Sequence, residues 1–175
     1  KLTGLHLLGW GADYPDPTNF LDYHFGANSS LQFGNKFPAI TDVLTQAGAT
    51  SDAAQRKSLY AQANNAIKEN IPMIPIAHGG SGVAFKADVA GAHASPLGAE
   101  ELGVMKPGSR DSLVWIQNGE PGGLYCADET DGESLRVCGQ IGEGLYGFET
   151  GTATIKPLLA KSCTALADLL TWTCT

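Results

Sequence analysis

The sequence predicts a mixed α/β domain on two observations. Apolar residues recur at helical spacing over residues 38–70, and a short run of continuous apolar character follows at residues 73–77. The predicted order of strand, helices, strands, helix and strands favours a domain that contains both kinds of element. The chain has 175 residues, of which 43% are hydrophobic and 17% charged, so it can bury a core of its own.

The chain is expected to open on a short strand. Residues 5–10, Leu-His-Leu-Leu-Gly-Trp, form an apolar run typical of a buried strand. Residues 11–19 contain Gly, Asp, Pro and Asn, which predict a loop with several fixed turns. A helix is then expected from Pro38, because proline suits the first helical position. Its apolar face comprises Ile40, Val43, Leu44 and Ala47.

A second helix is expected from Ser51 or Asp52. Asp52 and Gln55 have the spacing of a capping box, and Pro72 cannot continue a helix. The buried face of this helix is predicted to comprise Leu59, Ala63, Ala66 and Ile67.

The remaining elements are shorter. We expect strands at residues 73–77, 83–86 and 113–117, with the first of them central in a sheet because it is apolar throughout. Residues 133–146 have a helical pattern that three glycines weaken. Residues 163–174 predict a β-hairpin whose turn is unusually apolar.

The charge balance limits the kinds of partner. The net charge is −7 and the isoelectric point is about 4.9, and the eleven basic residues are scattered. Nucleic-acid phosphates require a cluster of Lys and Arg, so we expect no nucleic-acid partner. No apolar stretch approaches the roughly 20 residues of a membrane span.

The four cysteines fall into two close pairs, Cys126 with Cys138 and Cys163 with Cys174. Neither pair has the spacing of a metal site. Four cysteines allow three disulfide connectivities, of which we favour the local one, with each bridge contributing roughly 2–3 kcal/mol. This pairing predicts an oxidising compartment. Four free thiols in a cytosolic protein are the alternative.

Three stretches resemble the family 5 extracellular solute-binding proteins, the oligopeptide and dipeptide class of ABC importers. Residues 9–21 are similar to the family pattern Gly-Trp-x-x-Asp-x-x-Asp-Pro-x-Asn-Phe. Residues 56–78, continuing to the turn at 95–98, resemble the last helix and strand of the family. Residues 113–162, including Gly119-Glu120-Pro121, resemble its first strand, turn and helix. The resemblance implies one mixed-sheet lobe of a type II periplasmic-binding-protein fold.

The order of these stretches differs from the family pattern. Residues 1–107 resemble the C-terminal part of the family, and residues 108–175 resemble the mature N-terminal part, both expected to pack as one α/β domain. Members of the family are also about three times longer. We therefore expect a truncated and circularly permuted chain, either natural or engineered, which is physically feasible because termini are often close in space.

The resemblance implies a binding function without catalysis or cofactor. Asp13 matches the aspartate that pairs with the α-amino group of a bound peptide, and Trp10 would pack beside it. Glu120, Gly123 and Leu124 lie where the first lobe of the family faces the cleft. The expected partner is a peptide or similar solute, full-length relatives dock on an ABC permease, and the expected location is extracytoplasmic. The alternative for Asp13 is a cap of its own turn, with Trp10 in the core.

Other functions have weaker support. The chain could be a scaffold or isolated lobe that binds nothing. A secreted serine hydrolase would need a nucleophile elbow, and the sequence Gly80-Ser81-Gly82 lacks its spacing. The four histidines have no metal-site spacing. The acidic residues between Cys126 and Cys138 suggest the start of a helix more than a calcium loop.

Overall fold

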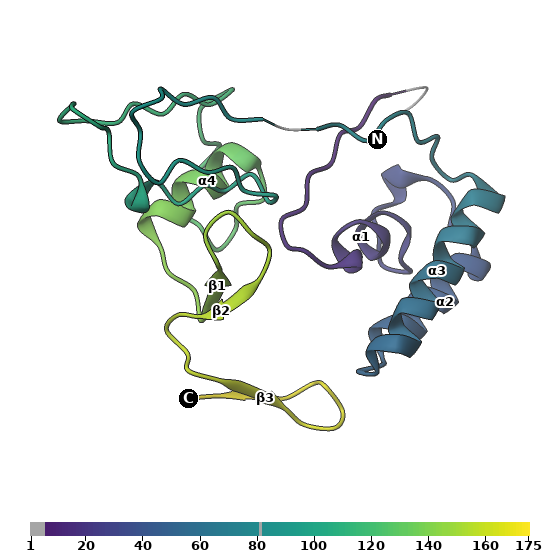
Figure 1. The fold of residues 1–175 in the computed structure, drawn as a ribbon. Helices are drawn as coiled ribbons and strands as arrows, with labels where there is room; N and C mark the ends of the chain where they lie inside the picture. The colour runs from purple at the N-terminus through teal and green to yellow at the C-terminus, as the bar shows by residue number, and fades with distance from the viewer. Residues whose placement is uncertain (1–5, 81) are drawn as a thin grey trace. The chain divides into compact units, whose positions relative to one another are not determined.

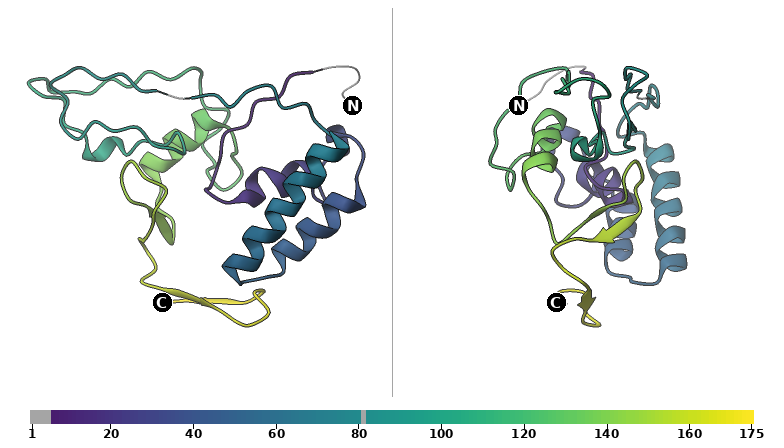
Figure 2. Two further views of the ribbon diagram at one scale, coloured as in Figure 1. Left: turned by 45° about the vertical axis from the view of Figure 1, so that its right-hand side comes forward. Right: turned by 60° about the vertical axis from the view of Figure 1, so that its left-hand side comes forward.

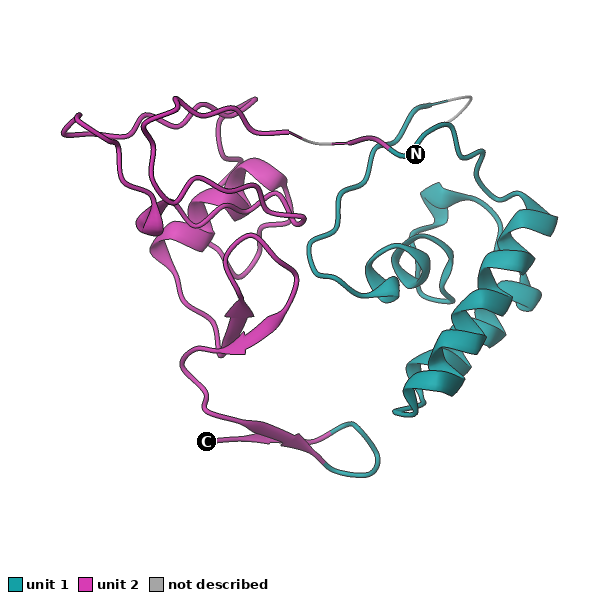
Figure 3. Ribbon diagram, in the orientation of Figure 1, with its two compact units in different colours: residues 1–78, 166–170 teal, residues 79–165, 171–175 magenta. Residues whose placement is uncertain are grey.

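The computed structural model describes residues 6–80 and 82–175 and divides the chain into two compact units (Figure 3). The first unit comprises residues 1–78 and 166–170, and the second comprises residues 79–165 and 171–175. Helices and short antiparallel strands are both present, so the general prediction of a mixed α/β chain is confirmed. No helix in the described ranges is long and apolar enough to cross a membrane.

The first unit is helical. It contains the 3₁₀ turns η1 (Pro17–Asn19) and η2 (Leu31–Phe33) and the helices α1 (Leu21–Phe25), α2 (Pro38–Gly48) and α3 (Ala53–Asn70). The two long helices, α2 and α3, are joined by a short loop and lie side by side (Figures 1 and 2). Both were predicted, α2 with Pro38 in its first turn as expected.

The ends of α3 follow from local chemistry. The Asp52 carboxylate accepts a hydrogen bond from the backbone N–H of Gln55 at 2.6 Å, as the predicted cap requires. The helix ends at Asn70 because Pro72 cannot continue it, and Ile71 between them has left-handed backbone angles, φ 45° and ψ 56°. That conformation is costly for a β-branched residue.

The core of the first unit lies between α2 and α3. Its buried residues are Ile40, Leu44, Ala47, Leu59, Tyr60 and Ala63, with Val43, Ala66 and Ile67 packed against them. These include every residue predicted for the two apolar faces. Each large side chain buried here contributes roughly 1.5–3 kcal/mol relative to an exposed one, so the pairing of the helices holds this unit together.

The second unit contains η3 (Leu102–Val104), α4 (Gly132–Ile141) and four short strands, β1 (Tyr146–Phe148), β2 (Ile155–Pro157), β3 (Cys163–Ala165) and β4 (Trp172–Cys174). Strand β1 pairs with β2 and β3 with β4, both antiparallel, and an isolated bridge joins Ala90 to Lys106. The predicted hairpin at residues 163–174 is confirmed.

The cysteines pair locally, as predicted. Cys126 is bonded to Cys138 and Cys163 to Cys174, with Sγ–Sγ distances of 2.09 and 1.97 Å. The first bridge ties the loop before α4 to the buried side of that helix, and the second joins opposite residues of β3 and β4.

Several predicted strands are wrong. The structure has no strand at residues 6–10, 73–77, 83–86 or 113–117, and Leu5 of the first prediction lies outside the described residues. A strand requires a neighbour to pair its backbone groups, and the described part of the chain provides none for these segments. Several of their apolar side chains are consequently exposed, for example Ile74 at 75% and Ile116 at 87%.

The helix predicted for residues 133–146 is also shorter than expected. It ends at Ile141, and residues 146–148 form β1 instead. Gly142 has extended backbone angles there, and the high conformational entropy of glycine opposes continuation of the helix through Gly142 and Gly144.

Candidate functional site

Asn19 organises the loop that contains the predicted ligand-binding residues. Its side-chain oxygen accepts hydrogen bonds from the indole N–H of Trp10 at 3.1 Å and from the backbone N–H of Asp13 at 3.0 Å. Its side-chain amide donates to Oδ2 of Asp13 at 3.1 Å. Asn19 is only 3% exposed, so the residue that holds this arrangement is itself buried. The structure therefore brings Trp10 and Asp13 together through one shared residue.

The Asp13 carboxylate is half-buried and has no cationic partner among the described residues. The Asn19 amide orients it without neutralising it. A carboxylate held in this way is a strong acceptor for an ammonium group, because a charge-assisted hydrogen bond is about twice as strong as a neutral one.

Aromatic rings support Trp10 from behind. Tyr23 stacks on its indole at a centroid distance of 4.4 Å, and His24 meets it edge-on at 4.8 Å. Phe33 lies 4.9 Å from the His24 ring. The Phe20 carbonyl lies 2.8 Å from Nδ1 of His24, so Nδ1 donates, and Nε2 is buried without a partner among the described residues. This packing fixes the orientation of the indole.

A second set of polar contacts connects the same loop to α3. The Arg56 guanidinium binds both carboxylate oxygens of Asp16, which also caps η1 by accepting from the backbone N–H of Thr18. Arg56 lies 4.9 Å over the Tyr60 ring, and the Tyr60 hydroxyl donates to Asp22 at 3.1 Å. Asp16 therefore holds a turn within residues 11–19, where the sequence predicted a loop with fixed turns.

The pKa values of Asp16, Tyr60 and Asp22 are shifted by their burial and by the charges around them. The hydrogen bonds from Arg56, opposed by partial burial, lower the pKa of Asp16 to about 2. Burial, followed by the nearby Asp22 carboxylate, raises the pKa of Tyr60 to about 12. Burial also raises the pKa of Asp22. At neutral pH Asp16 is therefore charged and Tyr60 remains a hydrogen-bond donor.

An apolar pocket of about 760 Å³ lies beside Trp10 within the first unit. Its lining includes the apolar residues Leu8, Trp10, Ile67, Ile71 and Ile74 and the cation Lys68. Its volume lies within the usual range for small-molecule sites. It offers an apolar space next to the loop that holds Asp13.

The other predicted binding residues belong to the second unit. Glu120 and Leu124 are exposed, and the backbone N–H of Gly123 donates to the Ser134 hydroxyl at 3.3 Å. Asp13 and Trp10 belong to the first unit. A role of Glu120, Gly123 and Leu124 in binding stays a prediction.

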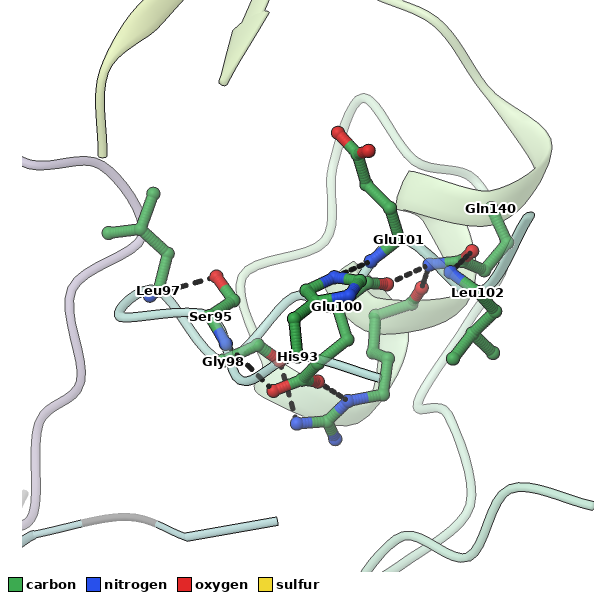
Figure 4. A network of polar contacts seen from close by, with 9 residues as sticks. His93, Ser95, Leu97, Gly98, Glu100, Glu101, Leu102 and Gln140 are labelled. Carbon is green, nitrogen blue, oxygen red and sulfur yellow. Dashed lines mark hydrogen bonds and ion pairs between the residues drawn. The ribbon is translucent and has the colours of Figure 1, made fainter. Parts of the chain in front are cut away.

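A polar network in the second unit joins the turn at residues 95–98 to α4 (Figure 4). Glu100 is 2% exposed and pairs with Arg136 at 3.3 Å, and its carboxylate also accepts from the backbone N–H of Ser95. Arg136 donates to the Gly98 carbonyl at 2.6 Å, and Gln140 donates to the Glu100 carbonyl at 2.7 Å. Each group is bonded to protein, so we interpret this network as structural.

The weaker candidate sites gain no support from the structure. Within residues 6–80 and 82–175, no three His, Cys, Asp or Glu side chains are placed to hold a metal ion. Asp131 instead caps α4 by accepting from the backbone N–H of Ser134 at 2.8 Å, as the predicted helix start implies. Ser81, whose sequence Gly80-Ser81-Gly82 lacks the spacing of a nucleophile elbow, lies outside the described residues.

Sequence reasoning missed Asn19, Arg56 and the pair Glu100–Arg136. Asn19 belongs to the stretch at residues 9–21 that resembles the family pattern, but that pattern does not predict which neighbours Asn19 binds. Arg56 is separated by 40 residues from Asp16, and Arg136 by 36 residues from Glu100. No local pattern signals pairs so distant in sequence.

The chain is similar to bacterial proteins that bind peptides. The di/tripeptide-binding protein 1 of Pseudomonas aeruginosa (strain UCBPP-PA14) is 36% identical over 77 residues, which cover 41% of this chain and 14% of that protein. For the dipeptide-binding protein of Escherichia coli (strain K12), the identity is 31% over 96 residues, covering 53% and 18%. For the periplasmic oligopeptide-binding protein of the same strain, it is 33% over 69 residues, covering 39% and 12%.

These similarities confirm the predicted resemblance to the peptide class of solute-binding proteins. The chain spans less than a fifth of the length of each of these three relatives. No model of a protein family matches the chain. No solved structure matches it either.

Proposed function

We propose that this chain supplies a peptide-anchoring part of an extracytoplasmic solute-binding protein. Asp13 receives the α-ammonium group of the peptide, and Trp10 forms an apolar wall beside it. One observation supports this above others: Asn19 holds the Asp13 carboxylate beside the Trp10 indole, and no described cation occupies it. The peptide-binding relatives support the same class of ligand.

The physical basis is an exchange of solvent for protein contacts. A free ammonium group loses hydration when it binds, so the carboxylate must already be oriented if the interaction is to be favourable. Asn19 supplies that orientation, and the rings behind Trp10 keep the indole in place. The reaction is capture and release, and the relatives, which are named as binding proteins, support a function without catalysis.

We also propose that the chain is one lobe of a type II periplasmic-binding-protein fold. This lobe is truncated and permuted, so that residues 1–107 correspond to the C-terminal part and residues 108–175 to the N-terminal part. Glu120, Gly123 and Leu124 would also take part in binding, and an ABC permease would receive the solute. The two disulfides and the periplasmic relative support an extracytoplasmic location.

The test is a thermal-shift and calorimetric screen of the chain against di-, tri- and longer peptides. A peptide at a hundredfold excess over its Kd should stabilise the protein by about 2.7 kcal/mol. The stabilisation should disappear in Asp13→Asn and persist in Asp111→Asn, which removes the same charge from an exposed site in the second unit. An absence of stabilisation by every peptide would favour the alternative of a scaffold that binds nothing.

A further inference from the structure

One asparagine of the second unit is followed directly by glycine. Asn118-Gly119 is the single Asn-Gly pair of the sequence, and both residues are exposed at a bend in the chain. We propose that Asn118 is a site of spontaneous deamidation, in which its side chain becomes aspartate or isoaspartate without the help of an enzyme. The proposal concerns a covalent modification and does not depend on the binding of a peptide.

The reaction is an acyl transfer within the chain. The backbone nitrogen of Gly119 loses its proton and attacks Cγ of Asn118, the new bond closes a succinimide ring, and Nδ2 leaves as ammonia. Water then opens the ring at either of its two carbonyl groups. Opening at one carbonyl gives aspartate, and opening at the other gives isoaspartate, in which the backbone runs through the former side chain. One water enters and one ammonia leaves, so the reaction requires no oxidant or reductant.

The structure leaves both reacting groups accessible to each other. No hydrogen bond joins the side-chain amide of Asn118 or the backbone N–H of Gly119 to another described residue, and the Gln117 side chain binds Gly119 only through its carbonyl. Glycine has no side chain to hinder closure of the ring, and it reaches more backbone conformations than other residues. The bend can therefore bring the nitrogen of Gly119 against Cγ of Asn118.

The pair Asp131-Gly132 provides an internal contrast. Aspartate before glycine can close the same ring, with water as the leaving group. The Asp131 carboxylate, however, caps α4 by accepting from the backbone N–H of Ser134 at 2.8 Å, and Gly132 is the first residue of that helix. The hydrogen bonds from Ser134 also lower the pKa of Asp131, which keeps its carboxyl group ionised and resistant to attack. We therefore expect Asn118 to react and Asp131 to persist.

Deamidation would change the charge of a pocket in the second unit. Asn118 lines a space of about 760 Å³ whose charged lining residues are Glu120 and Arg136. A carboxylate at residue 118 lies two positions from Glu120, so the charge of the lining changes from balanced to negative. Isoaspartate also adds a methylene group to the backbone, which alters the spacing between Gln117 and Gly119.

The test is a time course of the 175-residue chain at mildly alkaline pH, where the backbone amide loses its proton more readily. After reduction, trypsin releases residues 111–136, which contain both pairs. Mass spectrometry should show that this peptide gains the mass difference between a hydroxyl and an amino group, and fragmentation should place the gain at residue 118. Asn35, an exposed asparagine that precedes Lys36, should remain unchanged over the same period.

Two alanine variants provide a matched comparison. A β-carbon at Gly119 would have Cγ of Glu133 as its nearest neighbour, at 3.9 Å, so Gly119→Ala should fold normally and slow the deamidation of Asn118 severalfold. Gly79→Ala adds a β-carbon in open space elsewhere in the second unit and should leave the rate unchanged. Asn118→Gln should abolish the mass gain, because the longer side chain closes a larger ring more slowly.

The outcomes decide the proposal in either direction. Deamidation at Asn118 that Gly119→Ala slows and Gly79→Ala does not would support it. An Asn118 that stays unmodified throughout the time course, or that reacts equally fast in wild type and Gly119→Ala, would overturn it.

Discussion

Arg56 and Asp16, forty residues apart in sequence, form a bidentate ion pair. Nη1 of Arg56 lies 2.8 Å from Oδ2 of Asp16, and Nη2 lies 2.8 Å from Oδ1. Because Asp16 also caps η1, this pair ties the loop that contains Asp13 to the surface of α3. The geometry of the candidate site thus depends on a helix that contributes no ligand-anchoring group.

Replacing Arg56 should loosen that loop. Arg56→Lys keeps the charge but cannot bind both oxygens at once, so we expect a loss of roughly 0.5–1 kcal/mol in the free energy of unfolding. Arg56→Met should cost more, because the charge and the ring contact with Tyr60 both disappear. Urea unfolding followed by far-UV circular dichroism measures both. A loss no larger than that of Lys57→Met, on the exposed neighbour, would contradict the expectation.

The same pair predicts a loss of stability in acid. The pKa of Asp16 is lowered to about 2 in the folded protein, chiefly by its hydrogen bonds from Arg56. A lowered pKa means that the stabilisation is fully present above the unfolded value near 3.8 and is lost as the pH falls from there through about 2. Because Asp16 is one-third exposed, we expect only about 1 kcal/mol after screening by solvent. Unfolding measured over this pH range should show a smaller decline in Asp16→Asn.

Asn19 should be essential for both stability and binding. In Asn19→Asp, the oxygen can still accept from Trp10, but the donor to Asp13 is lost and a second carboxylate faces the first. We expect a cost of roughly 1–3 kcal/mol in unfolding free energy and the loss of peptide binding. Asn65→Asp, at an exposed position of α3, is the control. Peptide affinity unchanged in Asn19→Asp would refute the role given to this residue.

Removal of Arg136 should destabilise the second unit. Arg136→Met leaves the Glu100 carboxylate buried without its cation, and breaking a buried pair from one side costs roughly 3–5 kcal/mol. Glu100→Gln in the same background should recover part of the loss, because it removes the unpaired charge. The measurement is hydrogen exchange of the α4 amides, with the α3 amides as the reference. Equal protection of the α4 amides in wild type and Arg136→Met would exclude a stabilising role of Arg136 in the second unit.

The two disulfides should act on different elements. Cys163→Ser with Cys174→Ser should expose the β3–β4 amides to exchange, because an isolated two-stranded hairpin is only marginally stable. Cys126→Ser with Cys138→Ser should instead weaken α4, which contains Cys138. Each double variant should lose roughly 2–3 kcal/mol of unfolding free energy, as expected for loops of this length. Each double variant is the control for the other, and identical exchange patterns would contradict the assignment.

Local chemistry was sufficient to predict the helices α2 and α3. Pro38, the Asp52 cap and Pro72 set the ends of α2 and α3, and the spacing of Ile40, Leu44 and Leu59 set their buried faces. The hairpin and the disulfides were predicted for the same reason, since both join residues close in sequence.

The strands could not be predicted in the same way. An apolar run such as residues 73–77 has the composition of a strand, but a strand forms only where a neighbour pairs with it, and composition does not reveal the neighbour. The candidate site shows the same limit. Asp13 and Trp10 were predicted from a motif, whereas their connection through Asn19 depends on the path of the loop.

The exposed side chains of residues 73–77 and 113–117 have a consequence for the behaviour of the protein at high concentration. Unpaired apolar segments can pair with those of another molecule, and mutual repulsion between chains of net charge −7 opposes this. The repulsion vanishes near the isoelectric point of about 4.9 and is screened by salt. Colloidal stability should therefore be greatest at neutral to mildly alkaline pH and low ionic strength, and precipitation should begin as the pH approaches 5.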